Sequence, residues 1–129
     1  MILAIDPGRD KCGLAVLDNS AVALEKKIVK RSEIENEVFA FVAKYLIDTI
    51  VIGGGTEAKA VQKAILKLDL KLNIVFTKEE FSTLEARKKY WIENPPKGLL
   101  RLLPKSLLSP PVPIDDYAAA ILGERYLKG

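Results

Sequence analysis

The sequence predicts an α/β protein with one mixed sheet, and two features of the chain indicate this. Residues 1–30 show three short strands joined by turns, which is the pattern of an antiparallel meander. After residue 31, segments with helical spacing of apolar residues alternate with short buried strands. A meander followed by alternating helices and strands predicts five strands in a mixed sheet, with helices packed on its faces.

The meander accounts for the first three strands. The first is expected over residues 1–6, an almost wholly apolar segment that ends at the turn residues Pro7 and Gly8. The second is expected over residues 13–17, and a second run of turn residues separates it from a third over residues 21–30. Because the connections are this short, neighbouring strands must run antiparallel.

The rest of the chain carries the helices. Ser32 and Glu35 have the spacing of a capping box, as do Ser82 and Glu85, and each pair is predicted to start a helix. Thr56 is predicted to cap another helix, and a pair of prolines ends the helix that Ser82 begins. The expected elements are helices over roughly 33–46, 57–68, 82–93 and 116–127, with strands over 49–52 and 72–77.

Composition excludes several kinds of chemistry. The chain has 129 residues, of which 49% are hydrophobic, so we expect one globular domain over residues 1–129. It has no histidine and one cysteine, Cys12, which excludes Ser-His and Cys-His catalysis and a four-cysteine zinc site. Cys12 is expected to be a small buried strand residue, and a chain without disulfides suits the cytoplasm. No apolar run is long enough for a membrane span and no leader precedes the first strand, so neither membrane insertion nor secretion is expected.

Acidic residues stand where the predicted strands end and the last helix begins. Asp6 ends the first strand, Glu79 and Glu80 follow the fifth, and Asp115 and Asp116 open the last helix. Ligand sites of α/β sheets lie at such strand ends. Mg²⁺ and Mn²⁺ take oxygen ligands, so converging carboxylates could hold a metal pair for in-line attack on a phosphodiester.

Each of these acids also has a structural interpretation. Asp115 can be a helix N-cap, and Asp116 a first-turn residue that favours the helix dipole. Asp6 can begin an Asx-type turn, and Glu80 can be an exposed loop charge. The glycines at residues 53–55 could approach a phosphate, but the segment lacks the lysine of a P-loop, so a tight turn is the preferred interpretation.

Basic residues gather between residues 87 and 105, whereas the net charge of the whole chain is only +3. Glu93 is the one acidic residue in that segment, so the local balance is strongly positive and could face phosphates. A solvated face is the alternative interpretation. The basic residues of the segment are Arg87, Lys88, Lys89, Lys97, Arg101 and Lys105.

Three sequence motifs together span nearly the whole chain. The first is IDPG at residues 5–8 with GLAVLD at 13–18, the second is KEEFSTLEA at 78–86, and the third is DDYAAAIL at 115–122, followed by a Tyr-Leu pair. In this order they resemble the YqgF/RuvX family, whose members are described as Holliday-junction resolvases or ribosomal RNA precursor nucleases. The Asp-Pro-Gly of the first motif also resembles RuvC resolvases.

The resemblance implies an RNase H-like fold with sheet order 3-2-1-4-5, in which strands 1 to 3 are antiparallel. It places Asp6, Glu79 and Asp115 in the catalytic and metal-binding positions, and RuvC spacing adds Asp116. The implied activity is Mg²⁺- or Mn²⁺-dependent cleavage of ribosomal RNA precursor or branched DNA. Two symmetric cuts in a junction need two sites, so a homodimer is implied for that substrate. The residues expected to contact phosphates are Lys11, Arg87, Lys88, Lys97, Arg101 and Lys105.

The sequence departs from the family pattern at several positions. The family has Thr-Lys-Arg where this chain has Arg9, Asp10 and Lys11, and Glu80 stands in place of the arginine of the second motif. A proline-rich segment over residues 94–113 is also unlike the family. One alternative function is therefore a nucleic-acid-binding module that keeps the fold without catalysis. Another is a sugar-kinase-like or actin-like nucleotide binder, although those proteins pair two such domains.

Overall fold

The structure is a computed structural model that describes residues 1–77, 83–95 and 113–128. The elements expected from the sequence are present within these residues, with ends that differ by a few positions. The strands are β1 (Ile2–Asp6), β2 (Lys11–Leu17), β3 (Ala23–Lys30), β4 (Thr49–Ile52) and β5 (Asn73–Phe76). The helices are α1 (Ile34–Lys44), α2 (Ala58–Leu66), α3 (Thr83–Glu93) and α4 (Asp115–Lys128), and a 3-10 turn over Arg31–Glu33 precedes α1.

The five strands form one sheet in the order β3-β2-β1-β4-β5, which confirms the predicted order. The strand pairs β1–β2 and β2–β3 are antiparallel, whereas β1–β4 and β4–β5 are parallel. β1 is therefore central, and its carboxyl end lies beside the carboxyl end of its parallel neighbour β4. Asp6 is the last residue of β1.

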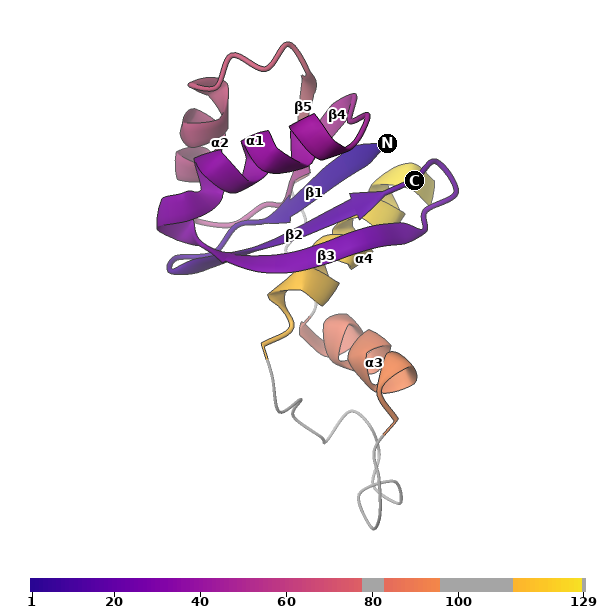
Figure 1. The fold of residues 1–129 in the computed structure, drawn as a ribbon. Helices are drawn as coiled ribbons and strands as arrows, with labels where there is room; N and C mark the ends of the chain where they lie inside the picture. Colours follow the sequence, from indigo (N-terminus) through magenta and orange to yellow (C-terminus); the bar gives the residue numbers. More distant parts are fainter. Residues whose placement is uncertain (78–82, 96–112, 129) are drawn as a thin grey trace.

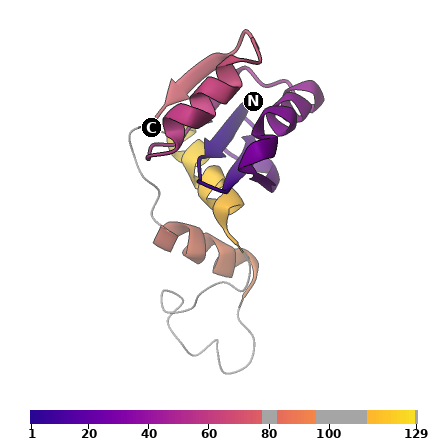
Figure 2. The same ribbon diagram turned by 90° about the vertical axis from the view of Figure 1, so that its left-hand side faces the viewer.

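Helices cover both faces of the sheet (Figures 1 and 2). α1 and α2 lie on one face and α4 lies on the other. Side chains alternate along each strand: Leu3 and Ile5 of β1 pack in the core beneath α1 and α2, while Ile2 and Ala4 pack toward α4. Because both faces are covered, β1 and β4 are apolar along almost their whole length.

Small residues let α4 lie close to the sheet. Three alanines in succession, at positions 118 to 120, are buried on this helix. A side chain at Gly123 would overlap the Leu17 side chain and meet the Ala4 Cβ. The close approach fixes the position of α4 over β1 and β2, and with it the position of the acidic residues at the start of the helix.

α3 packs on α4 rather than on the sheet (Figures 1 and 2). Ala86 of α3 forms a small buried cluster with Ala118 and Ile121 of α4. None of the helices in the described part of the chain is long and apolar enough to cross a bilayer. Cys12 is a fully buried residue of β2, as expected, and burial raises the pKa of its thiol.

The predicted helix caps are wrong where the structure describes them. Ser32 and Glu35 do not form a capping box, because Ser32 lies inside the 3-10 turn and the Ile34 N–H donates to the Arg31 carbonyl. Thr56 does not cap α2 either. The N-cap position belongs to Glu57, no side chain bonds the helix start, and the Ala58 N–H donates to the Gly55 carbonyl at 3.3 Å. The third proposed capping box includes Ser82, which lies outside the described residues.

Candidate functional site

Asp6 lies where the central strand of the sheet ends, beside the end of the parallel strand β4. It is the last residue of β1 and pairs with Gly13 of β2 in the antiparallel ladder. On its other side, the Gly53 N–H donates to the Ile5 carbonyl at 2.9 Å, so the loop after β4 leaves the sheet next to Asp6. Parallel strands that end side by side create the crevice in which α/β sheets place ligands.

The absence of a side chain at Gly13 allows the backbone of Asp115 to lie close to the end of β1. A Cβ at Gly13 would overlap the Asp115 backbone carbonyl, so the start of α4 rests directly on the β2 backbone. Since Gly13 is also the ladder partner of Asp6, this contact places the first turn of α4 beside the end of β1. Two acidic residues from opposite ends of the chain thus meet at one position.

Asp6 and Asp115 line one open pocket with a volume of about 550 Å³. The turn after β1 forms one wall, and the glycine-rich loop between β4 and α2 forms another. α3 and the start of α4 complete the pocket. The lining residues are Asp6, Pro7, Gly8, Arg9, Gly54, Gly55, Thr56, Glu57, Ala86, Ile114, Asp115 and Ala118.

The environment of Asp6 disfavours its negative charge. Burial, and after it the charge of Asp115, raises the pKa of Asp6 from 3.8 to about 6. No group in the described part of the chain donates a hydrogen bond to this carboxylate. Two carboxylates that share a pocket would be stabilised by a bound cation.

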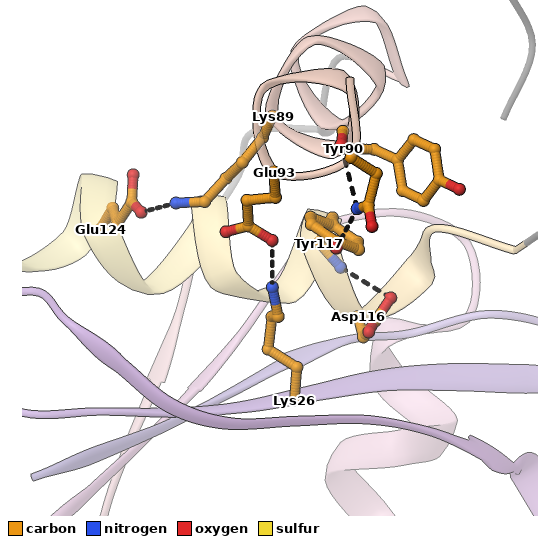
Figure 3. A network of polar contacts seen from close by, with 8 residues as sticks. Lys26, Lys89, Tyr90, Glu93, Asp116, Tyr117 and Glu124 are labelled. Carbon is orange, nitrogen blue, oxygen red and sulfur yellow. Dashed lines mark hydrogen bonds and ion pairs between the residues drawn. The ribbon is translucent and has the colours of Figure 1, made fainter. Parts of the chain in front are cut away.

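Asp116 does not line this pocket. Its Oδ1 atom accepts a hydrogen bond from the Tyr117 N–H at 3.0 Å (Figure 3). The pKa of Asp116 is raised, mainly by burial and to a smaller extent by the charge of Asp115. The Tyr117 N–H and the Lys26 ammonium oppose this shift. Of the two neighbouring acids, Asp115 lines the pocket with Asp6, whereas Asp116 does not.

Glu79 lies outside the described residues, so the structure leaves its position as predicted from the sequence. Among the described residues, no group of three or more acidic or cysteine side chains is arranged to hold a metal ion. The elements on either side of the Glu79 segment do reach this edge. The Thr77 N–H donates to the Ile52 carbonyl at the end of β4, and Ala86 of α3 lines the pocket.

Polar contacts hold α3 against α4 and β3 (Figure 3). The Lys26 ammonium forms an ion pair with Glu93 at 3.0 Å and lies 3.8 Å from the centre of the Tyr117 ring. Lys89, one turn before Glu93 in α3, forms an ion pair with Glu124 of α4. These contacts fix α3, which carries Ala86 into the pocket wall.

Arg31 connects the two loops on either side of the pocket. Its Nη1 atom donates to the Gly8 carbonyl at 3.2 Å and to Glu57 Oε2 at 2.9 Å. Its backbone N–H donates to the Asp10 carbonyl at 2.8 Å. One guanidinium therefore holds the turn after β1 against the loop before α2, and it neutralises Glu57.

The structure places the predicted basic residues unevenly. Lys11 is exposed at the start of β2 and does not line the pocket, whereas its neighbour Arg9 does. On α3, Arg87 is half-buried and Lys88 is exposed. The remaining predicted phosphate contacts, Lys97, Arg101 and Lys105, lie outside the described residues.

Sequence reasoning missed two parts of this site. The sequence predicts only a tight turn for the glycines at residues 53–55, yet residues 54–57 form a pocket wall, and Gly55 has a φ of 123° with open space beside it. Arg9 was passed over in favour of Lys11. The parallel pairing of β1 with β4 could have indicated the loop, because both strands then end at one edge.

Comparison with known proteins identifies the fold. No protein-family model and no curated protein matches this sequence. The solved structure titled "Thermus thermophilus RuvC structure" superimposes with a TM-score of 0.55 at 12% sequence identity, and the alignment covers 98% of this chain and 92% of that chain. The chain therefore has the RuvC-like form of the RNase H-like fold, as the sequence motifs implied.

Proposed function

We propose that this protein is a metal-dependent nuclease that hydrolyses phosphodiester bonds in structured nucleic acid. The observation that carries the proposal is that Asp6 and Asp115 line one open pocket at the edge of a RuvC-like sheet. The chain has no histidine, so acid–base chemistry must rest on other groups. Carboxylates that hold a divalent cation are the solution the residues offer.

The residues of the pocket fit Mg²⁺ or Mn²⁺. Such ions take one or two protein carboxylates and complete their shell with water and substrate phosphate. Asp6 and Asp115 supply two carboxylates, and burial together with the charge of Asp115 raises the pKa of Asp6, as expected for acidic groups that a cation would stabilise. A divalent ion there would activate water and stabilise charge on the phosphate.

The other site residues have proposed roles of different kinds. Glu79 is proposed as a third ligand, because the family resemblance assigns it and α3, which follows its segment, lines the pocket. Asp116, which RuvC spacing makes a supporting ligand, is proposed to have the smaller role, because it does not line the pocket. Arg9 is proposed to contact a substrate phosphate, since it lines the pocket and forms no ion pair with a described residue.

The substrate is proposed from the motif resemblance. Its three motifs point to branched DNA or ribosomal RNA precursor, and a junction substrate would require a homodimer to make symmetric cuts. The pocket is open, as cleavage within a long polymer requires. Membership of the YqgF/RuvX family belongs to the same proposal.

A cleavage panel tests the proposed function. The purified protein would be incubated with four-way junction DNA, ribosomal RNA precursor and single-stranded RNA, each with Mg²⁺, Mn²⁺ or chelator. We expect cleavage of a structured substrate with either metal and none in chelator. Asp6→Asn should abolish it, whereas Asp10→Asn should retain it, because Asp10 is exposed in the same turn and does not line the pocket.

The panel also separates the proposal from its main rival. A nucleic-acid-binding module without catalysis would retain its affinity for these substrates in chelator and would cleave none of them with metal. Cleavage that persists in Asp6→Asn would contradict the assignment of the site, even if the protein proved to be a nuclease.

A further inference from the structure

Three lysines form a row along the outer face of α2. Lys59, Lys63 and the C-cap residue Lys67 are all exposed, while Ala58, Val61 and Ile65 are buried against the sheet. Residues four apart lie on the same face of a helix, about 6 Å from one another along its axis. The three lysines therefore follow one another along the helix, on the face of α2 that points away from the core.

The charge of this row is not compensated by the described parts of the chain. None of the three lysines forms an ion pair with a described residue, and α2 contains no acidic residue. Glu57 precedes the helix, but Arg31 already pairs with it, and Asp69 follows beyond the end. By contrast, several other lysines are held by carboxylates: Lys26, Lys27, Lys44 and Lys89.

The row begins at the rim of the pocket. Residues 54–57 line the pocket and lead directly into α2, so Lys59 stands two residues beyond the pocket wall. Arg9 lines the pocket itself. The positive charges thus continue from the acidic site outward along one helix, on the face of the sheet opposite α4 (Figure 2).

We propose that Lys59, Lys63 and Lys67 bind the backbone of duplex nucleic acid beyond the bond that is cut. This inference rests on the proposed function and adds the path of the duplex, that is, where it lies on the protein surface. From the sequence, phosphate contacts are expected at residues 87–105 instead. One strand of duplex DNA carries a charge about every 3.4 Å of its axis, so cations about 6 Å apart meet roughly every second phosphate. The lysines read no sequence, because phosphate contacts position a duplex without specifying bases.

Salt dependence of binding tests this path. The affinity of the full chain for a short fluorescent duplex DNA would be measured in chelator, between about 50 and 200 mM salt. The test variant changes Lys59, Lys63 and Lys67 to Gln. The control changes Lys27, Lys44 and Lys128 to Gln, which removes the same charge from β3, α1 and α4. Far-ultraviolet circular dichroism would verify that both variants are folded.

We expect the slope of log affinity against log salt to become shallower by about 2 to 3 in the α2 variant, because each phosphate contact contributes about 0.9. The control variant should change this slope by less than about 0.9, the contribution of one phosphate contact. Equal slopes in the wild type and the α2 variant, or equal losses in both variants, would overturn the path while leaving the proposed function standing. A wild type that binds no duplex or junction DNA and no RNA would overturn the path together with the proposed function.

Discussion

The charge of Asp115 contributes to raising the pKa of Asp6, although the two residues lie near opposite ends of the chain. Gly13 makes this possible, since it pairs with Asp6 and leaves room for the Asp115 backbone. The acidic pair is therefore a product of strand pairing and helix packing together. Each part of that arrangement can be tested separately.

Asp115→Asn should lower the pKa of Asp6 without restoring its ordinary value. Burial is the larger cause of the raised pKa and stays in place, whereas the charge of Asp115 is removed. A ¹³C NMR titration of the Asp6 carboxyl carbon in chelator would measure the change. An Asp6 pKa of about 6 in both proteins would show that the two carboxylates do not interact.

Asp6→Asn should stabilise the metal-free protein at neutral pH. The folded-state pKa is raised from 3.8 to about 6, so ionisation of Asp6 opposes folding. The cost is absent below about pH 4, grows as the pH rises through this interval, and reaches at most about 3 kcal/mol at about 1.4 kcal/mol per pH unit. Denaturant unfolding in chelator should show the gain at about pH 7 and none at about pH 4.

Asp10→Asn is the control for this measurement, because Asp10 is exposed in the turn that follows Asp6. It should leave the free energy of unfolding nearly unchanged at both pH values. If Asp6→Asn instead destabilised the protein at neutral pH, Asp6 would be a structural residue, as in an Asx-type turn.

Gly13→Ala should disturb both the fold and the site. The added methyl group would overlap the Asp115 carbonyl, so α4 must shift away from β2. Overpacking of this kind costs about 1 to 3 kcal/mol. Thermal unfolding measures the cost, and the Asp6 pKa should fall as Asp115 moves away. A variant that melts as the wild type does and keeps the raised pKa would contradict the proposed contact.

Lys26→Met should destabilise the protein more than Glu93→Gln does. Lys26→Met removes both the ion pair with Glu93 and the contact of the ammonium with the Tyr117 ring. Glu93→Gln removes the ion pair and weakens the hydrogen bond between Glu93 and Tyr117, but it leaves Lys26 over the ring. A partly exposed ion pair contributes up to about 1 kcal/mol, and the cation–π contact about 0.5 to 1 kcal/mol more. Urea unfolding followed by Trp91 fluorescence would give both values. Equal losses would remove the role assigned to the tyrosine.

The sequence predicted the sheet well because its strands are marked by patterns that burial imposes. β1 and β4 are buried on both faces and have apolar sequences. The short turns after β1 and β2 make β1, β2 and β3 neighbours in the sheet. The caps failed because they depend on local geometry. Ser32 has capping-box spacing, but the chain enters α1 through a 3-10 turn that satisfies the Ile34 N–H by backbone alone.

The site could be predicted only in part. Asp6 was identifiable because a carboxylate at the end of an apolar strand is unusual. Asp115 and Asp116 are both first-turn residues, so the sequence could not determine which of them faces the pocket. In the structure the backbone of Asp115 packs on Gly13, and Asp115 is the residue that lines the pocket. Arg9 and the loop at residues 54–57 join the site only through the parallel pairing of β1 with β4.

Calorimetric titration with Mn²⁺ tests most directly whether the pocket of Asp6 and Asp115 holds a divalent cation. We predict that the wild type binds Mn²⁺ and that Asp6→Asn and Asp115→Asn each weaken binding at least about tenfold, which corresponds to about 1.4 kcal/mol. Asp10→Asn should bind as the wild type does. Equal affinities in all four proteins would place the metal elsewhere and contradict the account.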